Sequence, residues 1–132
     1  MYNKNEYAKT DVKFYVRGIT DTSKIERRGK YLLIMNYKGI EKEIYKTMTH
    51  ATPCKMIING ITDGIKILKM PCNIKLYTHT PIGLESYFKN GTGVNKRLVQ
   101  ILFENLYMGN HSLEEFICKD RQGELKEKMK NI

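Results

Sequence analysis

The stretch TMTHATPCKMIINGITDGIKILKMPCNIKLYTHTPIGL, residues 47–84, decides the fold of this chain. Thr52-Pro53 is typical of a helix start, because Thr can cap a helix and Pro fits its first position, where no N–H is needed. Apolar residues then recur at helical spacing, at Ile57, Ile61, Ile65 and Leu68. Met70-Pro71 stops the pattern. This segment therefore predicts one amphipathic helix.

The rest of the stretch predicts a strand and a second helix. Side chains alternate from Cys72 to Thr78, with Ile74 and Leu76 on one face of the strand. Thr80-Pro81 then repeats the helix-start signal. A strand enclosed by two helices is typical of a sheet with helical layers on its faces.

Three more strands are predicted before this stretch. Val12 to Arg17 alternates and ends at Gly18, Tyr31 to Tyr37 is the most apolar run, and Ile40 to Thr47 is polar enough to lie near an edge. The polar segment Ile19 to Lys30 connects the first two. Because the connections are local, we expect the three strands to form a meander.

The remaining elements complete the order. A helix is predicted from Asn95 to Tyr107, closed by Gly109. A short strand is predicted from Leu113 to Cys118, and a terminal helix from Gln122 to Met129. The sequence therefore predicts the α/β class, with an α+β-type mixed sheet of five strands flanked by helices. We expect residues 1–11 to be a polar N-terminal lead-in and residues 12–132 to form a single domain.

Composition limits the functional classes. The 132 residues include 23 Lys and Arg against 14 Asp and Glu, a formal net charge of +9. This sign favours polyanions, nucleic acid first and then acidic protein surfaces, although such a charge can also serve solubility alone. No apolar run reaches the ~18 residues of a membrane span, no signal peptide is visible at the start, and three widely spaced cysteines give no disulfide framework. We expect a cytoplasmic protein without membrane contact.

The deciding stretch resembles the ribonuclease H type 1 family. Its P-C-N-I-K-L-Y-T-H-T segment is similar to the family's P-C-x-V-x-x-Y-T-D-S strand, and A-T-P-C-K-M is similar to the T-T-N-N-x-x-E-L helix start. The resemblance covers Val12 to the C-terminus and implies a ribonuclease H-like fold, in agreement with the order of elements. It also implies a site in which clustered carboxylates hold two Mg²⁺ ions about 4 Å apart.

The catalytic acids of that family are missing from the matching positions. The residues that stand there are Arg17, Ile57, His79 and, in a shortened segment, Gly123. Mg²⁺ demands oxygen ligands, and one nearby acid, Asp120 or Glu124, cannot hold two ions. We therefore predict a pseudoenzyme of the ribonuclease H family with no catalytic residue, no metal and no cofactor.

Basic residues carry the predicted function, a non-catalytic module that binds duplex nucleic acid or an RNA–DNA hybrid through its phosphates. The family's paired Asn at the helix start are replaced by Pro53 and Cys54, so its own hybrid contacts are eroded. The candidate contacts are Arg17, Arg27, Arg28, Lys30, Lys55, His79, Lys96, Arg97 and Arg121. The resemblance places four of them around the former cleft, namely Arg17, Lys55, His79 and Arg121. The alternative is that these are solvated surface charges.

Two other functions stay open. A protein–protein adaptor or inhibitor, for example of phage or mobile-element origin, could reuse the scaffold, and a residual enzyme could use an unrecognised site. Structural zinc is disfavoured because the candidate ligands form no close pair such as C-x₂-C. Those ligands are His50, Cys54, Cys72, His79, His111 and Cys118. The identity of a partner and the oligomeric state do not follow from these patterns.

Overall fold

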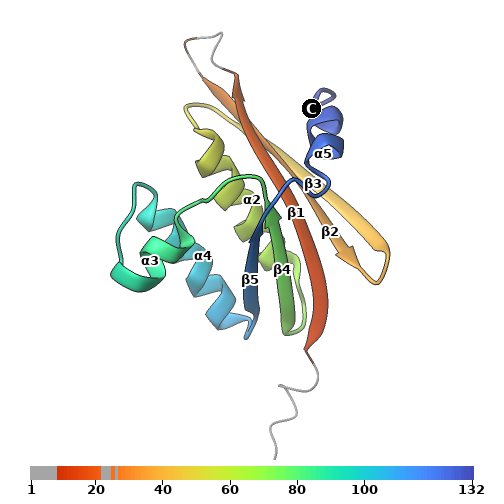
Figure 1. Ribbon diagram of the computed structural model, residues 1–132, viewed down its shortest axis with the longest axis vertical. Helices are drawn as coiled ribbons and strands as arrows, with labels where there is room; N and C mark the ends of the chain where they lie inside the picture. Colours follow the sequence, from red (N-terminus) through yellow and green to blue (C-terminus); the bar gives the residue numbers. More distant parts are fainter. Residues whose placement is uncertain (1–8, 22–24, 26) are drawn as a thin grey trace, which may run out of the picture.

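A five-stranded sheet divides the molecule into two layers of helices in the computed structural model, which describes residues 9–21, 25 and 27–132 (Figure 1). The strand order is β3-β2-β1-β4-β5. The elements are β1 (Thr10–Asp21), β2 (Arg28–Tyr37), β3 (Ile40–Met48), α2 (Pro53–Ile67), β4 (Cys72–Thr78), α3 (Leu84–Asn90), α4 (Lys96–Met108), β5 (Ser112–Ile117) and α5 (Gln122–Met129). The first three strands are antiparallel, and β4 and β5 are parallel to β1. The predicted order and the mixed sheet are confirmed.

The larger core lies between the sheet and α2, with α4 packed against α2. The side chain of Thr52 accepts a hydrogen bond from the backbone N–H of Lys55, so the predicted helix start is correct. Close packing explains the two glycines inside α2. A Cβ on Gly64 would lie 2.5 Å from Cδ2 of Leu33, and one on Gly60 would lie 2.8 Å from the Tyr31 ring. Any larger side chain would therefore push α2 off the sheet.

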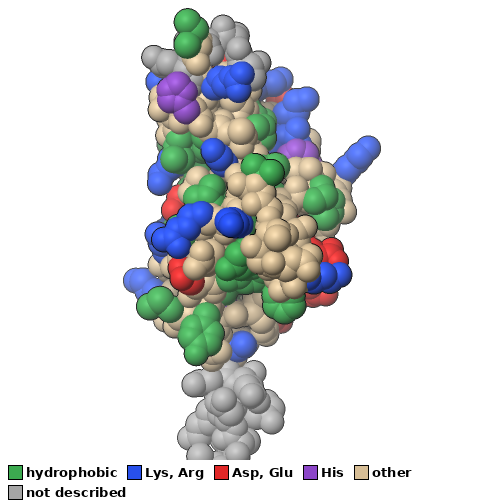
Figure 2. Space-filling view, turned by 90° about the vertical axis from the view of Figure 1, so that its left-hand side faces the viewer, with side chains coloured by type: hydrophobic (Ala, Val, Ile, Leu, Met, Phe, Trp, Pro, Cys, Tyr) green, Lys and Arg blue, Asp and Glu red, His purple; other side chains and the backbone are tan. Residues whose placement is uncertain are grey.

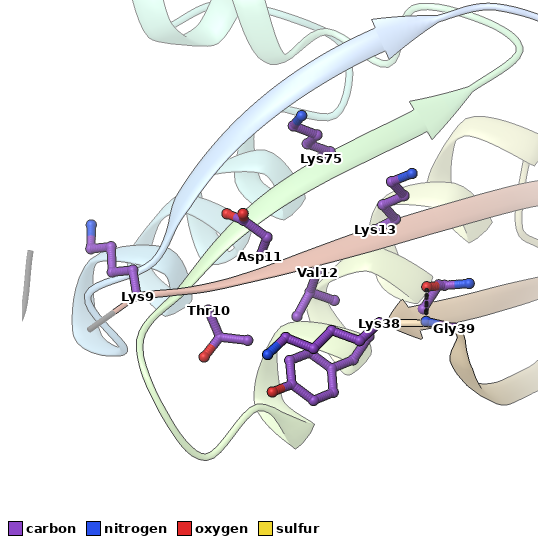
Figure 3. Close-up of a pocket in the computed structure, with 10 residues that line it drawn as sticks. Lys9, Thr10, Asp11, Val12, Lys13, Lys38, Gly39 and Lys75 are labelled. Carbon is purple, nitrogen blue, oxygen red and sulfur yellow. Dashed lines mark hydrogen bonds between the residues drawn. The ribbon is translucent and has the colours of Figure 1, made fainter. Parts of the chain in front are cut away.

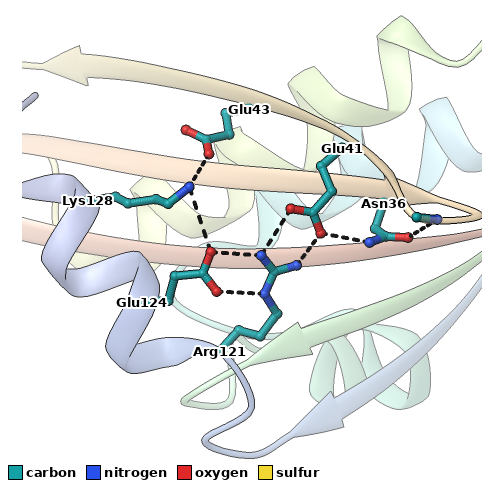
Figure 4. A network of polar contacts seen from close by, with 7 residues as sticks. Asn36, Glu41, Glu43, Arg121, Glu124 and Lys128 are labelled. Carbon is teal, nitrogen blue, oxygen red and sulfur yellow. Dashed lines mark hydrogen bonds and ion pairs between the residues drawn. The ribbon is translucent and has the colours of Figure 1, made fainter.

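The opposite face of the sheet carries α5 (Figure 1). Leu125 and Met129 are fully buried against β1 and β2. Ion pairs extend this packing to the edge strand β3: Arg121 binds the carboxylates of Glu41 and Glu124, and Lys128 binds those of Glu43 and Glu124 (Figure 4). The terminal helix is thus fastened to three strands.

Some predicted boundaries are wrong. The first strand continues past Gly18 to Asp21, and the second begins at Arg28 instead of Tyr31, because these polar ends pair with each other. The helix predicted at Thr80-Pro81 begins only at Leu84, because Ile82 is buried in the core and Gly83 adopts φ 84°, a left-handed conformation outside a helix.

The predicted lead-in lies mostly outside the described residues, but Thr10 and Asp11 already belong to β1. No helix in the described part of the chain is both long and apolar enough to cross a bilayer.

Candidate functional site

Arg17, which stands where the resemblance implies an acid, contacts the first residue of α5. The Arg17 guanidinium on β1 donates through Nη1 to Oε1 of Gln122, 3.4 Å away, and Nε2 of Gln122 donates to the carbonyl of Val16 at 3.2 Å. On the other side of β1, a Cβ on Gly18 would lie 2.9 Å from Cγ1 of Ile57. The helix α2 therefore approaches β1 closely at this level of the sheet.

Two of the former acid positions carry basic side chains, Arg17 and His79, which are close enough to interact electrostatically. Burial lowers the pKa of His79, which follows β4, and the positive charge of Arg17 lowers it further. Within the described residues, Nε of Arg17 and Nδ1 of His79 are buried without a hydrogen-bond partner. Buried polar atoms usually have partners, so Nε–H of Arg17 is free to donate a hydrogen bond, and Nδ1 of His79 is free to form one, with a ligand group or a water molecule.

The residues at these positions do not fit a pair of magnesium ions. A guanidinium donates hydrogen bonds and has no lone pair for a metal, the Ile57 side chain is apolar and fully buried, and Mg²⁺ demands oxygen ligands. Glu124 is held by Arg121 and Lys128. In the described part of the chain, no group of three or more His, Cys, Asp or Glu side chains is placed to hold a metal.

The start of α5 contains Gly123, which was assigned to the fourth acid position, and its neighbour Gln122. Gly123 is exposed, and a Cβ there would meet no atom within 4 Å. Its neighbour Gln122 is 4% exposed and contacts Arg17 instead. Gln122 is the first residue of the predicted helix, and no pattern in the sequence indicates its contact with Arg17.

A second basic surface lies on the α4 side of α2. One pocket of about 450 Å³ is lined by His50, Lys55 and Arg97, and an adjoining pocket of about 290 Å³ reaches Lys96. The two pockets share Val94 and Asn95. No Asp or Glu lines either of them. We call these two pockets together the basic groove.

The nine predicted contact residues thus separate into groups. Arg17 and His79 lie at the former cleft, and Lys55, Lys96 and Arg97 line the basic groove. Lys55, which the resemblance places around the former cleft, lines the basic groove in the structure.

The other four residues lie elsewhere. Lys30 donates to the carbonyls of Met129 and Ile132 and so closes the end of α5. Arg121 is held in ion pairs and lies 4.8 Å from the centroid of the Tyr15 ring. Arg27 and Arg28 are exposed at the start of β2.

Part of the sequence is similar to curated ribonucleases H. The ribonuclease H of Thermoanaerobacter sp. (strain X514) is 32% identical over 63 residues, which are 48% of this chain and 40% of the relative. That of Wolbachia sp. subsp. Drosophila simulans (strain wRi) is 36% identical over 50 residues, 38% of this chain and 34% of the relative. The match therefore spans two fifths of these relatives or less. No protein-family model matches the chain.

Solved structures extend the similarity to most of the chain. Ribonuclease H1 of the halophilic archaeon Halobacterium salinarum NRC-1 has a TM-score of 0.69 over 92% of this chain and 99% of that protein, at 14% identity. LC9-RNase H1, a type 1 RNase H with the type 2 active-site motif, has a TM-score of 0.66 over 81% of this chain and 62% of that one, at 12% identity. At such identities the likeness shows the fold. This chain therefore has a ribonuclease H-like fold, and part of its sequence is similar to ribonucleases H.

Proposed function

We propose that this domain is a non-catalytic module that binds nucleic acid, duplex or RNA–DNA hybrid, through phosphate contacts. The observation that carries the proposal is the basic groove, where Lys55, Lys96 and Arg97 gather without a carboxylate among the lining residues. Phosphate contacts of Lys and Arg supply most of the sequence-independent affinity for nucleic acids. The groove also borders the N-terminal end of α2, where the helix dipole favours an anion.

The surface around the groove supports the same function. On the side of the molecule formed by α3 and α4, Lys and Arg side chains spread over the upper and middle parts, and acidic side chains lie toward the margins (Figure 2). The net charge of +9 adds a long-range attraction for polyanions. The expected affinity is therefore strongly dependent on salt.

The loss of two-metal hydrolysis is part of the proposal. It is supported by the chemistry of Arg17, Ile57 and His79, none of which offers Mg²⁺ an oxygen ligand. A cleft that carries a guanidinium repels divalent cations and attracts phosphates by the same Coulomb term. The domain would hold its ligand without cleaving it.

The test is a titration of the protein with single-stranded, duplex and RNA–DNA hybrid oligonucleotides at two salt concentrations, with Mg²⁺, followed by a gel of the products. We expect binding without cleavage, weakened steeply by salt. Lys55→Glu/Arg97→Glu should weaken binding at least tenfold, whereas Lys66→Glu/Lys126→Glu, the same charge change at two exposed lysines, should weaken it far less. Cleavage, or equal losses in both variants, would contradict the proposal.

A protein–protein adaptor is the second candidate, because a different pocket is apolar. This pocket, of about 450 Å³, is lined by Phe88 and Tyr107, which are 79% and 87% exposed. Its lining also includes Phe103 of α4 and Leu113 of the edge strand β5. Large exposed apolar patches mark interaction sites. Absence of nucleic-acid binding at low salt, together with co-purification of a stable partner, would favour this function.

A further inference from the structure

A pocket at the opposite end of the sheet from the former cleft gathers four lysines. It has a volume of about 530 Å³ and lies between the start of β1, the turn after β2 and the start of β4 (Figure 3). Its lysines are Lys9, Lys13, Lys38 and Lys75, and its lining includes a single carboxylate, Asp11. We call this pocket the lysine notch.

The topology of the sheet creates the notch. β1 pairs with β4 from Thr10 onward, but its pairing with β2 starts only at Lys13. The edge of β1 before Lys13 therefore faces the β2–β3 turn instead of a partner strand. Lys38 occupies this turn with φ 50°, next to Gly39 at φ 85°. The gap between strand edge and turn is open to a small ligand.

The lysines are not neutralised by the protein. Among the described residues, no hydrogen bond or ion pair engages the ammonium groups of these four lysines, and that of Lys38 lies 5.4 Å from the centroid of the Tyr37 ring. Lys13 and Lys75 are direct cross-strand partners, a pairing of like charges that is unfavourable without a counter-ion. Glu114, the partner of Lys75 on β5, lies outside the lining.

The one acid of the notch, Asp11, has a hydrogen-bond partner of its own. Nδ2 of Asn73 donates to Oδ1 of Asp11 at 3.2 Å, and the Ser112 hydroxyl donates to Oδ1 of Asn73 at 2.7 Å. Figure 3 shows Lys9, Lys13 and Lys75 extending from the same side of β1 as Asp11. A single, hydrogen-bonded carboxylate leaves the notch with an excess of positive charge.

We propose that the lysine notch is a binding site for adjacent phosphate groups, such as those of an oligophosphate or of a nucleic-acid backbone. Several ammonium groups around one pocket suit a ligand with several anionic oxygens, because each lysine is a mobile point charge with three donors. A monoanion could neutralise only part of the charge. The site is separate from the basic groove and the former cleft, with which it shares no lining residue.

The experiment is isothermal titration calorimetry at low salt, with tripolyphosphate, inorganic phosphate and a short single-stranded DNA as ligands. We expect the wild type to bind tripolyphosphate more tightly than phosphate. Lys13→Glu/Lys75→Glu should weaken tripolyphosphate binding at least tenfold, and Lys66→Glu/Lys126→Glu should not. Lys13→Gln/Lys75→Gln, with circular dichroism to verify folding, repeats the test without charge reversal.

Two further measurements test where tripolyphosphate binds and which kind of phosphate ligand the notch takes. Lys55→Glu/Arg97→Glu should weaken tripolyphosphate binding less than Lys13→Glu/Lys75→Glu does, so a failure of the proposed function and a failure of this site can be told apart. Competition by the DNA would support a nucleic-acid backbone as the occupant, and simultaneous binding would support a free oligophosphate. No heat with tripolyphosphate, or equal losses in the notch and control variants, would overturn the site.

Discussion

At the scale of single residues, Gly18 determines how closely α2 approaches β1. A Cβ at this position would lie 2.5 Å from the backbone carbonyl oxygen of Pro53 and 2.9 Å from Ile57. Gly18→Ala should therefore lower the free energy of unfolding by about 1–3 kcal/mol, the usual cost of overpacking. Urea unfolding measures it. The control is Gly123→Ala in α5, where nothing lies within 4 Å; this change should stabilise by up to about 1 kcal/mol, because Ala favours helix. Equal stability of wild type and Gly18→Ala would contradict this account of the contact.

His79 reports the charge of the former cleft. Burial is the main cause that lowers its pKa from 6.5, and Arg17 is the second. In Arg17→Gln we expect the pKa of His79 to rise but to stay below 6.5, because the burial remains. NMR titration of the imidazole signals measures this. His111, whose pKa is lowered by burial and by Lys9, is the internal control and should not move. An unchanged pKa of His79 in Arg17→Gln would show that the charge of Arg17 does not act on the imidazole.

At the scale of elements, the ion pairs of α5 predict a pH dependence. Hydrogen bonds from Arg121, then from Asn36, lower the pKa of Glu41 from 4.5 to about 2. A group with a lowered folded pKa stabilises the fold above its unfolded pKa and loses that contribution as the pH falls. Glu41→Gln should therefore cost up to about 1 kcal/mol at pH 7. The difference from wild type should shrink between pH 4.5 and 2.

Urea unfolding of wild type and Glu41→Gln at pH 7, 4 and 2 measures how their difference in stability changes with pH. Glu104→Gln is the matched control, since Glu104 is exposed on α4 and has no ion pair among the described residues. The control should show no pH-dependent difference from wild type. A cost of Glu41→Gln that stays constant with pH would show that the side chain acts through packing and not through its charge.

The elements also show what the sequence can predict. The bounds of β4 and α5 follow from the sequence because alternation and helical spacing record which face is buried. The end of β1 does not, because Ile19–Asp21 and the paired Arg28–Lys30 carry no alternating apolar pattern to detect, although Ile19 packs against the smaller core. The start of α3 fails for a different reason, since the burial of Ile82 is a tertiary contact that overrides the Thr80-Pro81 signal.

The candidate site was predictable only in part. Arg17, Ile57 and His79 could be placed by matching flanking residues, whereas Gln122 and the basic groove depend on how loops of different length return to the sheet. The grouping of Lys55 with Arg97, which are 42 positions apart in the sequence, is a product of the packing of α2 against α4. Charges on separate helices carry no sequence signal of their proximity.

At the scale of the whole molecule, the fold and the charge of the cleft are independent properties. The sheet and helices of a ribonuclease H-like domain are retained, while Arg17 and His79 occupy positions where the resemblance implies carboxylates. If only the charge of these side chains excludes metal, reversing it should restore a site for a divalent cation without changing the fold. Arg17→Asp/His79→Asp makes that change with two substitutions.

In the absence of metal, we expect this variant to melt below wild type, because two neighbouring carboxylates repel each other. Mg²⁺ or Mn²⁺ should raise its melting temperature in a concentration-dependent way, since a ligand that binds only the folded state stabilises it. Wild type should not respond. Arg27→Asp/Arg28→Asp, which places the same carboxylates on exposed positions at the start of β2, should not respond either. A metal-insensitive melting temperature of the cleft variant would show that the geometry around Ile57, and not the charge alone, closes the cleft to cations.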